Sequence, residues 1–122
     1  MDKFFKSIVD EDKCAVVICD TKHQIIYMNP AAQENYKKYG GKDLVGKSIM
    51  DCHNEKSCEM IKKVVNWFAV DTEHGRVHTF YNEKQKKDVY MVPLRDDSGL
   101  LIGYYEKHEY REPDETSLYD LY

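Results

Sequence analysis

The apolar positions in the first part of the chain predict a short helix followed by a β-hairpin. Residues 2–9 place aromatic and aliphatic side chains at helical spacing, and a charged break follows at residues 10–13. The run 14–19 is apolar and rich in β-branched residues, which favours a buried strand. A polar turn separates this run from residues 24–28, so the two segments are expected to pair as a hairpin.

The middle of the chain is predicted to be helical. Asn29 can cap free backbone N–H groups and Pro30 fits the first helical position, so a helix should begin here and run to about Tyr39. A short helical turn is expected at residues 43–46. Residues 54–70 have the pattern of a longer helix, in which the apolar side chains share one stripe: Met60, Ile61, Val64, Val65 and Phe68.

The remaining residues predict three more strands separated by polar turns. Residues 76–82, 89–94 and 100–110 have the β-branched and aromatic content of strands. Together with the hairpin near the N-terminus, they predict an α+β fold in which helices cover one face of an antiparallel sheet. The expected division of the chain is a lead helix at residues 1–12, a main domain at 13–110 and a loose acidic tail at 111–122.

Length, charge and apolar content narrow the functional classes. The 122 residues suffice for one domain, and an apolar content of 42% argues against disorder. A net charge of −4 disfavours binding to nucleic acid or to anionic membranes, which requires positive charge. No apolar run has the roughly 20 residues that span a bilayer, and the first residues lack the apolar stretch of a secretory signal. We therefore expect a cytoplasmic protein whose cysteines are reduced thiols: Cys14, Cys19, Cys52 and Cys58.

The cluster whose side chains are best suited to metal binding or reaction consists of Cys52, His53 and Cys58. Thiolate and imidazole groups bind zinc and haem iron, so one hypothesis is that His53 ligates haem or contacts another ligand. The alternative is that the two cysteines are small core residues and that His53 bonds a loop carbonyl. Zinc is disfavoured because no second spaced pair of ligands is present, and covalent haem because no Cys-x-x-Cys-His motif exists. No metal site is predicted.

Cys52 carries a second hypothesis, because it lies just before the predicted long helix. The positive end of a helix dipole favours the reactive thiolate, which suggests redox or electrophile sensing. Signatures of enzymes are missing from the sequence, which has no Gly-rich phosphate loop, Ser-centred elbow or His-Glu-x-x-His motif. We therefore predict no catalytic residues and expect a protein that is not an enzyme.

The other histidines and the tyrosines favour surface positions. Four histidines fall in turns or on strands and are expected to be mostly solvated: His23, His74, His78 and His108. His78 and Phe80 are predicted to share a strand face with Arg76, and this face either lines a ligand site or points outward. The tyrosines of the late strands either fill half-buried sheet positions or form a docking face for a partner: Tyr90, Tyr104, Tyr105 and Tyr110.

Three segments, in this order along the chain, resemble the PAS sensor domain family. Residues 25–32 are similar to the family's strand-then-helix entry with its Tyr-x-Asn-x-Ala pattern. Residues 44–48 resemble the family's Leu-x-Gly-Lys segment, and residues 92–103 resemble its Pro-x-x-Asp-x-x-Gly-x-x-x-Gly hairpin. Residues 51–57 resemble a PAS subgroup with a Cys-His-x-x-x-Ser start to the long helix, although Asn54 replaces the usual Pro and can still cap the helix.

The resemblance implies a five-stranded antiparallel sheet with helices across one face that enclose a pocket. Members of the family bind haem, flavin or small organic ligands there, or only mediate dimerisation. They usually pass a signal to a kinase, cyclase or transcription module. No such module is visible here, so the chain is expected to be a lone sensor, a piece of a larger protein or a partner-binding adaptor. The Asn-Cys-Arg-Phe motif of the flavin photosensors is not found.

We therefore predict a sensory module that binds a small molecule and signals through a homodimer or a signalling partner. The alternatives are a ligand-free interaction module and a haem-binding or thiol-redox sensor that uses His53 or Cys52. The sequence specifies no cofactor. The residues expected to line the pocket are Ile18, Ile26, Met28, Tyr36, Leu44, Ile49, Met50, Cys52, His53, Ile61, Val65, Phe80, Val92 and Tyr104.

Overall fold

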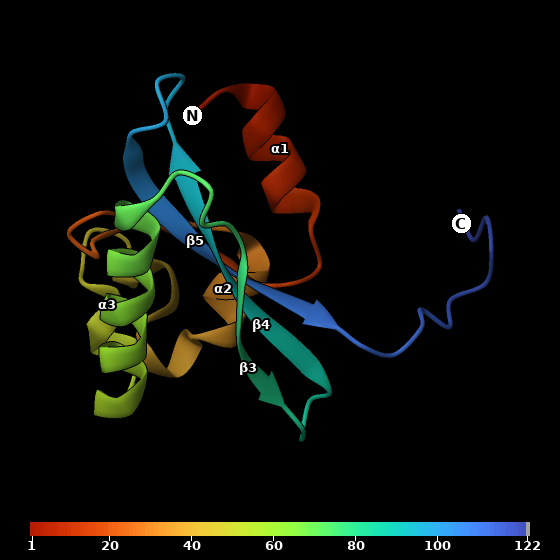
Figure 1. Ribbon diagram of the computed structural model, residues 1–122. Coiled ribbons are helices and arrows are strands. Elements are labelled where there is room, and N and C mark those ends of the chain that lie inside the picture. The colour runs from red at the N-terminus through yellow and green to blue at the C-terminus, as the bar shows by residue number, and fades with distance from the viewer. Residues whose placement is uncertain (122) are drawn as a thin grey trace.

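The computed structural model describes residues 1–121 as helices packed on an antiparallel sheet (Figure 1). The α-helices are α1 (Lys3–Glu11), α2 (Pro30–Asn35) and α3 (Glu55–Val70). Between α2 and α3 lie short 3-10 helices, η1 (Lys37–Tyr39), η2 (Gly41–Leu44) and η3 (Ile49–Cys52). The strands are β1 (Val16–Asp20), β2 (Ile25–Met28), β3 (Val77–Asn82), β4 (Lys87–Arg95) and β5 (Leu101–Tyr110). They form one antiparallel five-stranded sheet in the order β2-β1-β5-β4-β3, which confirms the predicted α+β fold.

The hydrophobic core lies between one face of this sheet and the segment from α2 to α3. Tyr104 of the central strand β5 and Met91 of β4 are almost fully buried in it. The predicted apolar stripe of the long helix is confirmed, because Ile61, Val65 and Phe68 of α3 are buried in the same cluster. Burial of one such side chain contributes about 1.5–3 kcal/mol. Side chains therefore fill the space directly between α3 and the sheet.

Asn29 joins three elements at the start of α2. Its side chain is fully buried, and its Oδ1 accepts hydrogen bonds from the backbone N–H groups of Val16 and Ala32, both at 2.9 Å. Its Nδ2 donates to the carbonyls of Val9 and Cys14 at 3.0 Å each. The predicted helix cap is thus confirmed, and the same side chain also fixes the end of α1 and the start of β1.

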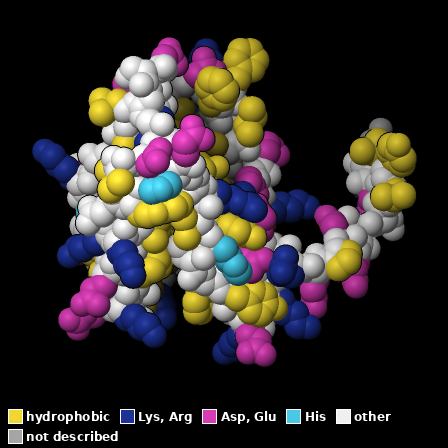
Figure 2. Space-filling view, viewed as in Figure 1, with side chains coloured by type: hydrophobic (Ala, Val, Ile, Leu, Met, Phe, Trp, Pro, Cys, Tyr) yellow, Lys and Arg dark blue, Asp and Glu magenta, His cyan; other side chains and the backbone are white. Residues whose placement is uncertain are grey.

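The helix α1 is attached through polar contacts and leaves its apolar stripe exposed. The Tyr27 hydroxyl of β2 donates to Asp10, and Lys107 Nζ of β5 lies 3.1 Å from Asp12. Figure 2 shows hydrophobic side chains at the surface over α1, near the top of the view. No residue of α1 is buried, and its large apolar side chains are 66–80% exposed: Phe4, Phe5 and Ile8.

The hairpin between β4 and β5 explains two glycines of the segment 92–103. Gly99 has a φ of +89°, a conformation that side chains with a Cβ rarely adopt. Gly103 lies against the neighbouring strand β1, where a Cβ would overlap the carbonyl of Cys19. Both glycines are therefore required by backbone geometry.

Several element boundaries differ from the prediction, among them the end of α2 and the start of β4. The helix that begins at Pro30 ends at Asn35, where Tyr36 is its C-cap, and the 3-10 helix η1 follows and ends at Gly40 in a left-handed conformation. Strand β4 begins at Lys87, inside the expected polar turn, where it pairs with Tyr110 of β5. Residues 111–121 follow β5 and extend away from the sheet (Figure 1).

We predict that Asn29→Ala lowers the free energy of unfolding by about 2–4 kcal/mol, because it removes a helix cap and leaves buried backbone groups without partners. Asn54→Ala is the matched control. Asn54 caps α3 in the same way, accepting from Ser57 N–H at 2.8 Å, but is exposed, so its loss should cost about 1 kcal/mol. Urea unfolding of both variants measures the difference. Equal losses would contradict a joining role for Asn29.

Candidate functional site

A hollow of about 650 Å³ lies where α2, η1 and the start of α3 face the β3–β4 hairpin and β5. It sits beside the filled core and opens to the surface. Its lining includes exposed apolar side chains, such as Phe80, and a group of buried or nearly buried polar side chains: Tyr36, Cys52, His53, Lys87, Glu106 and His108. We call this hollow the Glu106 cavity.

Glu106 is the hub of the buried polar groups. Its side chain is nearly fully buried, and its Oε1 accepts from the Tyr36 hydroxyl at 2.5 Å and from His108 Nε2 at 3.0 Å. Its Oε2 lies 3.2 Å from His53 Nε2. Burial by itself would favour the neutral acid, but the hydrogen bonds from His108 and His53 outweigh it and hold the pKa of Glu106 well below its usual range. Glu106 is therefore a carboxylate with three donors.

His53 is protonated on both ring nitrogens. Its Nδ1 lies 3.0 Å from the Ile49 carbonyl and its Nε2 lies 3.2 Å from the Glu106 carboxylate. Both partners are acceptors, so both nitrogens must donate and the ring is an imidazolium. Burial opposes this charge, but the hydrogen bonds with Cys52 and Glu106 raise the pKa of His53 to about 11. Because neither nitrogen is free, His53 does not fit the role of a haem ligand.

Cys52 lies beside His53 and is buried. Its Sγ is 3.2 Å from the Ile49 carbonyl and 3.3 Å from His53 Nδ1. This thiol is therefore in contact with the imidazolium, and its redox sensitivity stays a prediction. All four cysteines are free thiols in the structure.

Lys87 and His108 belong to the same cavity, although the sequence pattern did not indicate them. The side chain of Lys87 is buried, and its Nζ donates to Asn35 Oδ1 at 3.1 Å. Burial lowers the pKa of Lys87, while the nearby charge of Glu106 opposes this effect. His108 is only 6% exposed, so the expectation that it is solvated is wrong. The available signal was strand alternation, which places Glu106 and His108 on the same face as the buried Tyr104.

The other predicted pocket residues separate into three groups. Four of them line the Glu106 cavity, and a ligand-binding role for these stays a prediction: Tyr36, Cys52, His53 and Phe80. Seven belong to the core or pack against it and do not line this cavity: Met28, Leu44, Ile49, Met50, Ile61, Val65 and Tyr104. Three lie on the sheet face away from the core and also do not line it: Ile18, Ile26 and Val92.

A bulge in β3 decides which face Phe80 occupies. His78 pairs with Tyr90 of β4, but the register then shifts, and Phe80 pairs with Val89. The two side chains therefore lie on opposite faces, and the prediction that they share one is wrong. His78 and Tyr90 have ring centroids 5.1 Å apart on the outer face, whereas Phe80 lines the cavity.

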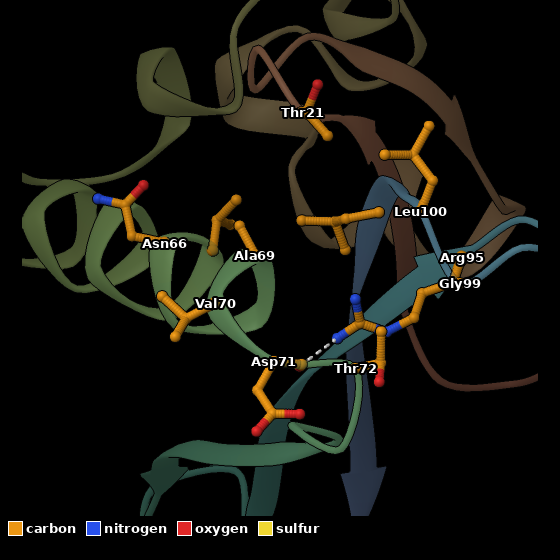
Figure 3. A pocket seen from close by; sticks show the side chains of 11 residues that line it. Thr21, Asn66, Ala69, Val70, Asp71, Thr72, Arg95, Gly99 and Leu100 are labelled. Atoms are coloured by element: carbon orange, nitrogen blue, oxygen red, sulfur yellow. Dashed lines mark hydrogen bonds between the residues drawn. The ribbon is translucent and has the colours of Figure 1, made fainter.

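A second hollow of about 370 Å³ lies between the end of α3 and the β4–β5 turn (Figure 3). Its main polar group is Arg95, which donates to the carbonyls of Phe68 at 2.9 Å, Asp71 at 3.2 Å and His74 at 3.0 Å. These carbonyls end α3 and the loop after it, so Arg95 acts as a C-terminal cap. We interpret this hollow as structural.

Within residues 1–121, no group of three or more His, Cys, Asp and Glu side chains is placed to hold a metal ion. Among the helices described here, none combines the length and apolar character needed to cross a bilayer.

Residues 13–105 match a family model described as PAS domain, which covers more than half of the chain. The family model identifies the PAS domain but not the Cys-His subgroup, so membership of that subgroup stays a prediction. The sequence matches no curated protein.

The fold is similar to solved structures of low sequence identity. The PAS domain of a Colwellia psychrerythraea protein superposes with a TM-score of 0.67 at 17% identity, over 88% of this chain and 93% of that one. A C-terminal domain from Streptococcus mutans gives 0.65 at 22% identity, over 86% and 81%. A sensory box sensor histidine kinase from Vibrio cholerae gives 0.61 at 13% identity, over 86% of each chain. These likenesses support the fold.

We predict that His53 remains an imidazolium at pH 8, since its pKa is raised from 6.5 to about 11. Imidazole nitrogen NMR should show both of its ring nitrogens protonated, and Glu106→Gln should lower the pKa of His53 because the negative charge that stabilises the imidazolium is lost. The folded pKa lies above the unfolded value, so the contribution of His53 to the free energy of unfolding is complete below pH 6.5 and is lost as the pH rises toward 11.

The control for this prediction is His74→Gln, in the loop after α3, which should leave the alkaline loss of stability unchanged, whereas His53→Gln should reduce it. A His53 ring that titrates near its ordinary value of 6.5 in the folded chain would contradict the imidazolium assignment.

Proposed function

The chain belongs to the PAS domain family of sensory and regulatory modules, and we propose that it senses a small molecule bound in the Glu106 cavity. The observation that carries this proposal is the cavity itself. Its volume of about 650 Å³ falls within the range of roughly 300–1,000 Å³ that is usual for small-molecule sites. It combines apolar walls with convergent polar groups, as such sites do. We assign to the protein binding rather than catalysis.

A ligand in this cavity contacts both layers of the fold. Tyr36 follows α2 and His53 precedes α3, while Lys87 and Glu106 belong to the sheet. A molecule that binds one arrangement of these layers more tightly shifts the population toward it. The cavity is therefore placed where occupancy changes the position of α2 against the sheet.

Asn29 links a shift in the position of α2 to α1. It caps α2 at one end of the helix, six residues before the cavity residue Asn35, and its Nδ2 holds the Val9 carbonyl at the end of α1. A shift of α2 thus alters the support of α1, whose apolar stripe is exposed. We propose that this stripe contacts a second copy of the chain or a signalling partner, which reads the change. A cytoplasmic location stays a prediction.

Binding in the cavity is tested with neutral aromatic probes: phenol, indole and benzamide. At least one should shift the backbone amide NMR signals of residues around Glu106 with an affinity in the millimolar range or better. Thr79→Trp adds a large side chain to the cavity lining and should abolish this binding. The matched control is Thr72→Trp in the second hollow, which should leave binding unchanged. No shift with any probe, or shifts that survive Thr79→Trp, would contradict the proposal.

The second candidate function is a ligand-free interaction module. The observation that favours it is α1, where Phe4, Phe5 and Ile8 are 66–80% exposed on one helix. A large exposed apolar patch on a small domain typically marks an interaction surface. Under this hypothesis the Glu106 cavity is a polar part of the scaffold and the domain works by docking alone.

We predict that Phe5→Ser weakens self-association or partner binding by about tenfold, because it removes a large apolar contact area from α1. Sedimentation or light scattering across a concentration series measures the dimer constant. Val70→Ser is the control, since Val70 is also a largely exposed apolar residue and lies at the end of α3. A chain that stays monomeric at all concentrations and is unaffected by Phe5→Ser would contradict self-association through α1.

A further inference from the structure

The Glu106 cavity has the opposite charge to the rest of the protein. The chain carries a net charge of −4, yet the charged residues that line the cavity are three lysines and one carboxylate, together with the His53 imidazolium. Lys38 and Lys84 are exposed at its rim, and Lys87 is buried. A concave site lined mainly by one sign of charge raises the local concentration of oppositely charged ligands. The cavity is therefore suited to an anion.

Lys87 is a buried charge that has no charged partner among the described residues. It is only 4% exposed, and its Nζ bonds to the neutral amide of Asn35. Within residues 1–121, no carboxylate lies within salt-bridge distance of it. A buried ammonium is costly unless an opposite charge pairs with it.

Glu106 does not supply this partner, because its oxygens already accept from Tyr36, His53 and His108. The charges of His53 and Glu106 cancel each other, which leaves one buried positive charge. His108 adds a further open group: its Nδ1 is buried and has no hydrogen-bond partner in the described part of the chain. One unpaired cation calls for one negative charge, which a carboxylate supplies and a phosphate dianion exceeds.

We propose that the cavity binds its small molecule through a single carboxylate group that pairs with the Lys87 ammonium. The apolar remainder of the ligand lies against Phe80 and Met60, which line the same cavity. Since it names the ligand class of the same site, this inference rests on the proposed function. It makes Lys87 the residue that distinguishes an acid from its neutral analogue.

The test compares three acids with their amides: acetate with acetamide, benzoate with benzamide, and phenylacetate with phenylacetamide. Titrations followed by NMR at pH 7 should show at least one acid that binds about tenfold more tightly than its amide, because a charge-assisted contact is added. Three acids that bind no more tightly than their amides would overturn the proposal. Inorganic phosphate that binds more tightly than all three acids would overturn the assignment to a carboxylate.

Lys87→Met keeps most of the aliphatic stem and removes the charge. It should lower the affinity of the acid about tenfold and change the affinity of the amide by less than about twofold. Lys84→Met is the matched control at the exposed rim, where the loss should stay below about threefold because solvent screens the charge. Equal losses of acid affinity in the two variants would indicate non-specific electrostatic attraction and would overturn a pairing with Lys87.

The outcomes separate this inference from the proposed function. If amides and acids bind the cavity equally, the carboxylate assignment fails while the ligand-binding function stands. If no acid, amide or neutral probe binds, the proposed function fails as well. Should Lys87→Met not fold, the comparison of acids with amides in the unmodified chain decides on its own.

Discussion

A buried carboxylate on the central strand organises this protein. Glu106 lies inside the domain, where an isolated negative charge would be strongly destabilising, so its burial requires donors from the surrounding elements. The structure supplies them from Tyr36 at the end of α2, from His53 two residues before α3 and from His108 of β5 itself. These bonds fix how the helical layer sits on this end of the sheet. The Glu106 cavity exists because polar groups, rather than interlocking apolar side chains, join the layers here.

The helical layer contacts the sheet in different ways at the two ends of the domain. Around Phe68 and Tyr104 the two layers meet through a filled core, and no ligand is needed to complete it. Around Glu106 they meet through buried charges, of which His53 and Glu106 compensate each other and Lys87 has no charged partner in the part of the chain that the structure describes. A fully packed core stabilises the fold and offers no space for a ligand, whereas a cavity with one unpaired buried charge favours the binding of an oppositely charged ligand. This difference is the physical basis for placing sensing at the Glu106 cavity and stability at α3.

Local patterns in the sequence were sufficient for the fold but not for the whole site. Alternation and helical spacing indicated the strands and the stripe of α3, and the chemistry of Asn29 and Asn54 indicated both caps. Tyr36 and His53 could also be placed near a pocket. Alternation along β5 places Glu106 on the same face as Tyr104, but a glutamate in a strand ordinarily faces solvent, and only the position of the helical layer shows that it is covered. The bulge that turns Phe80 toward the cavity depends on pairing with β4, which no local pattern reveals.

The most direct test of this account is a crystal structure of the full chain at high resolution, grown without added ligand. The account predicts that Glu106 accepts from Tyr36, His53 and His108 beside an open cavity, and that any retained density in it contacts Lys87. A Glu106 side chain turned to solvent, or a cavity closed by neighbouring side chains, would contradict the claim that this carboxylate holds the two layers around a binding site.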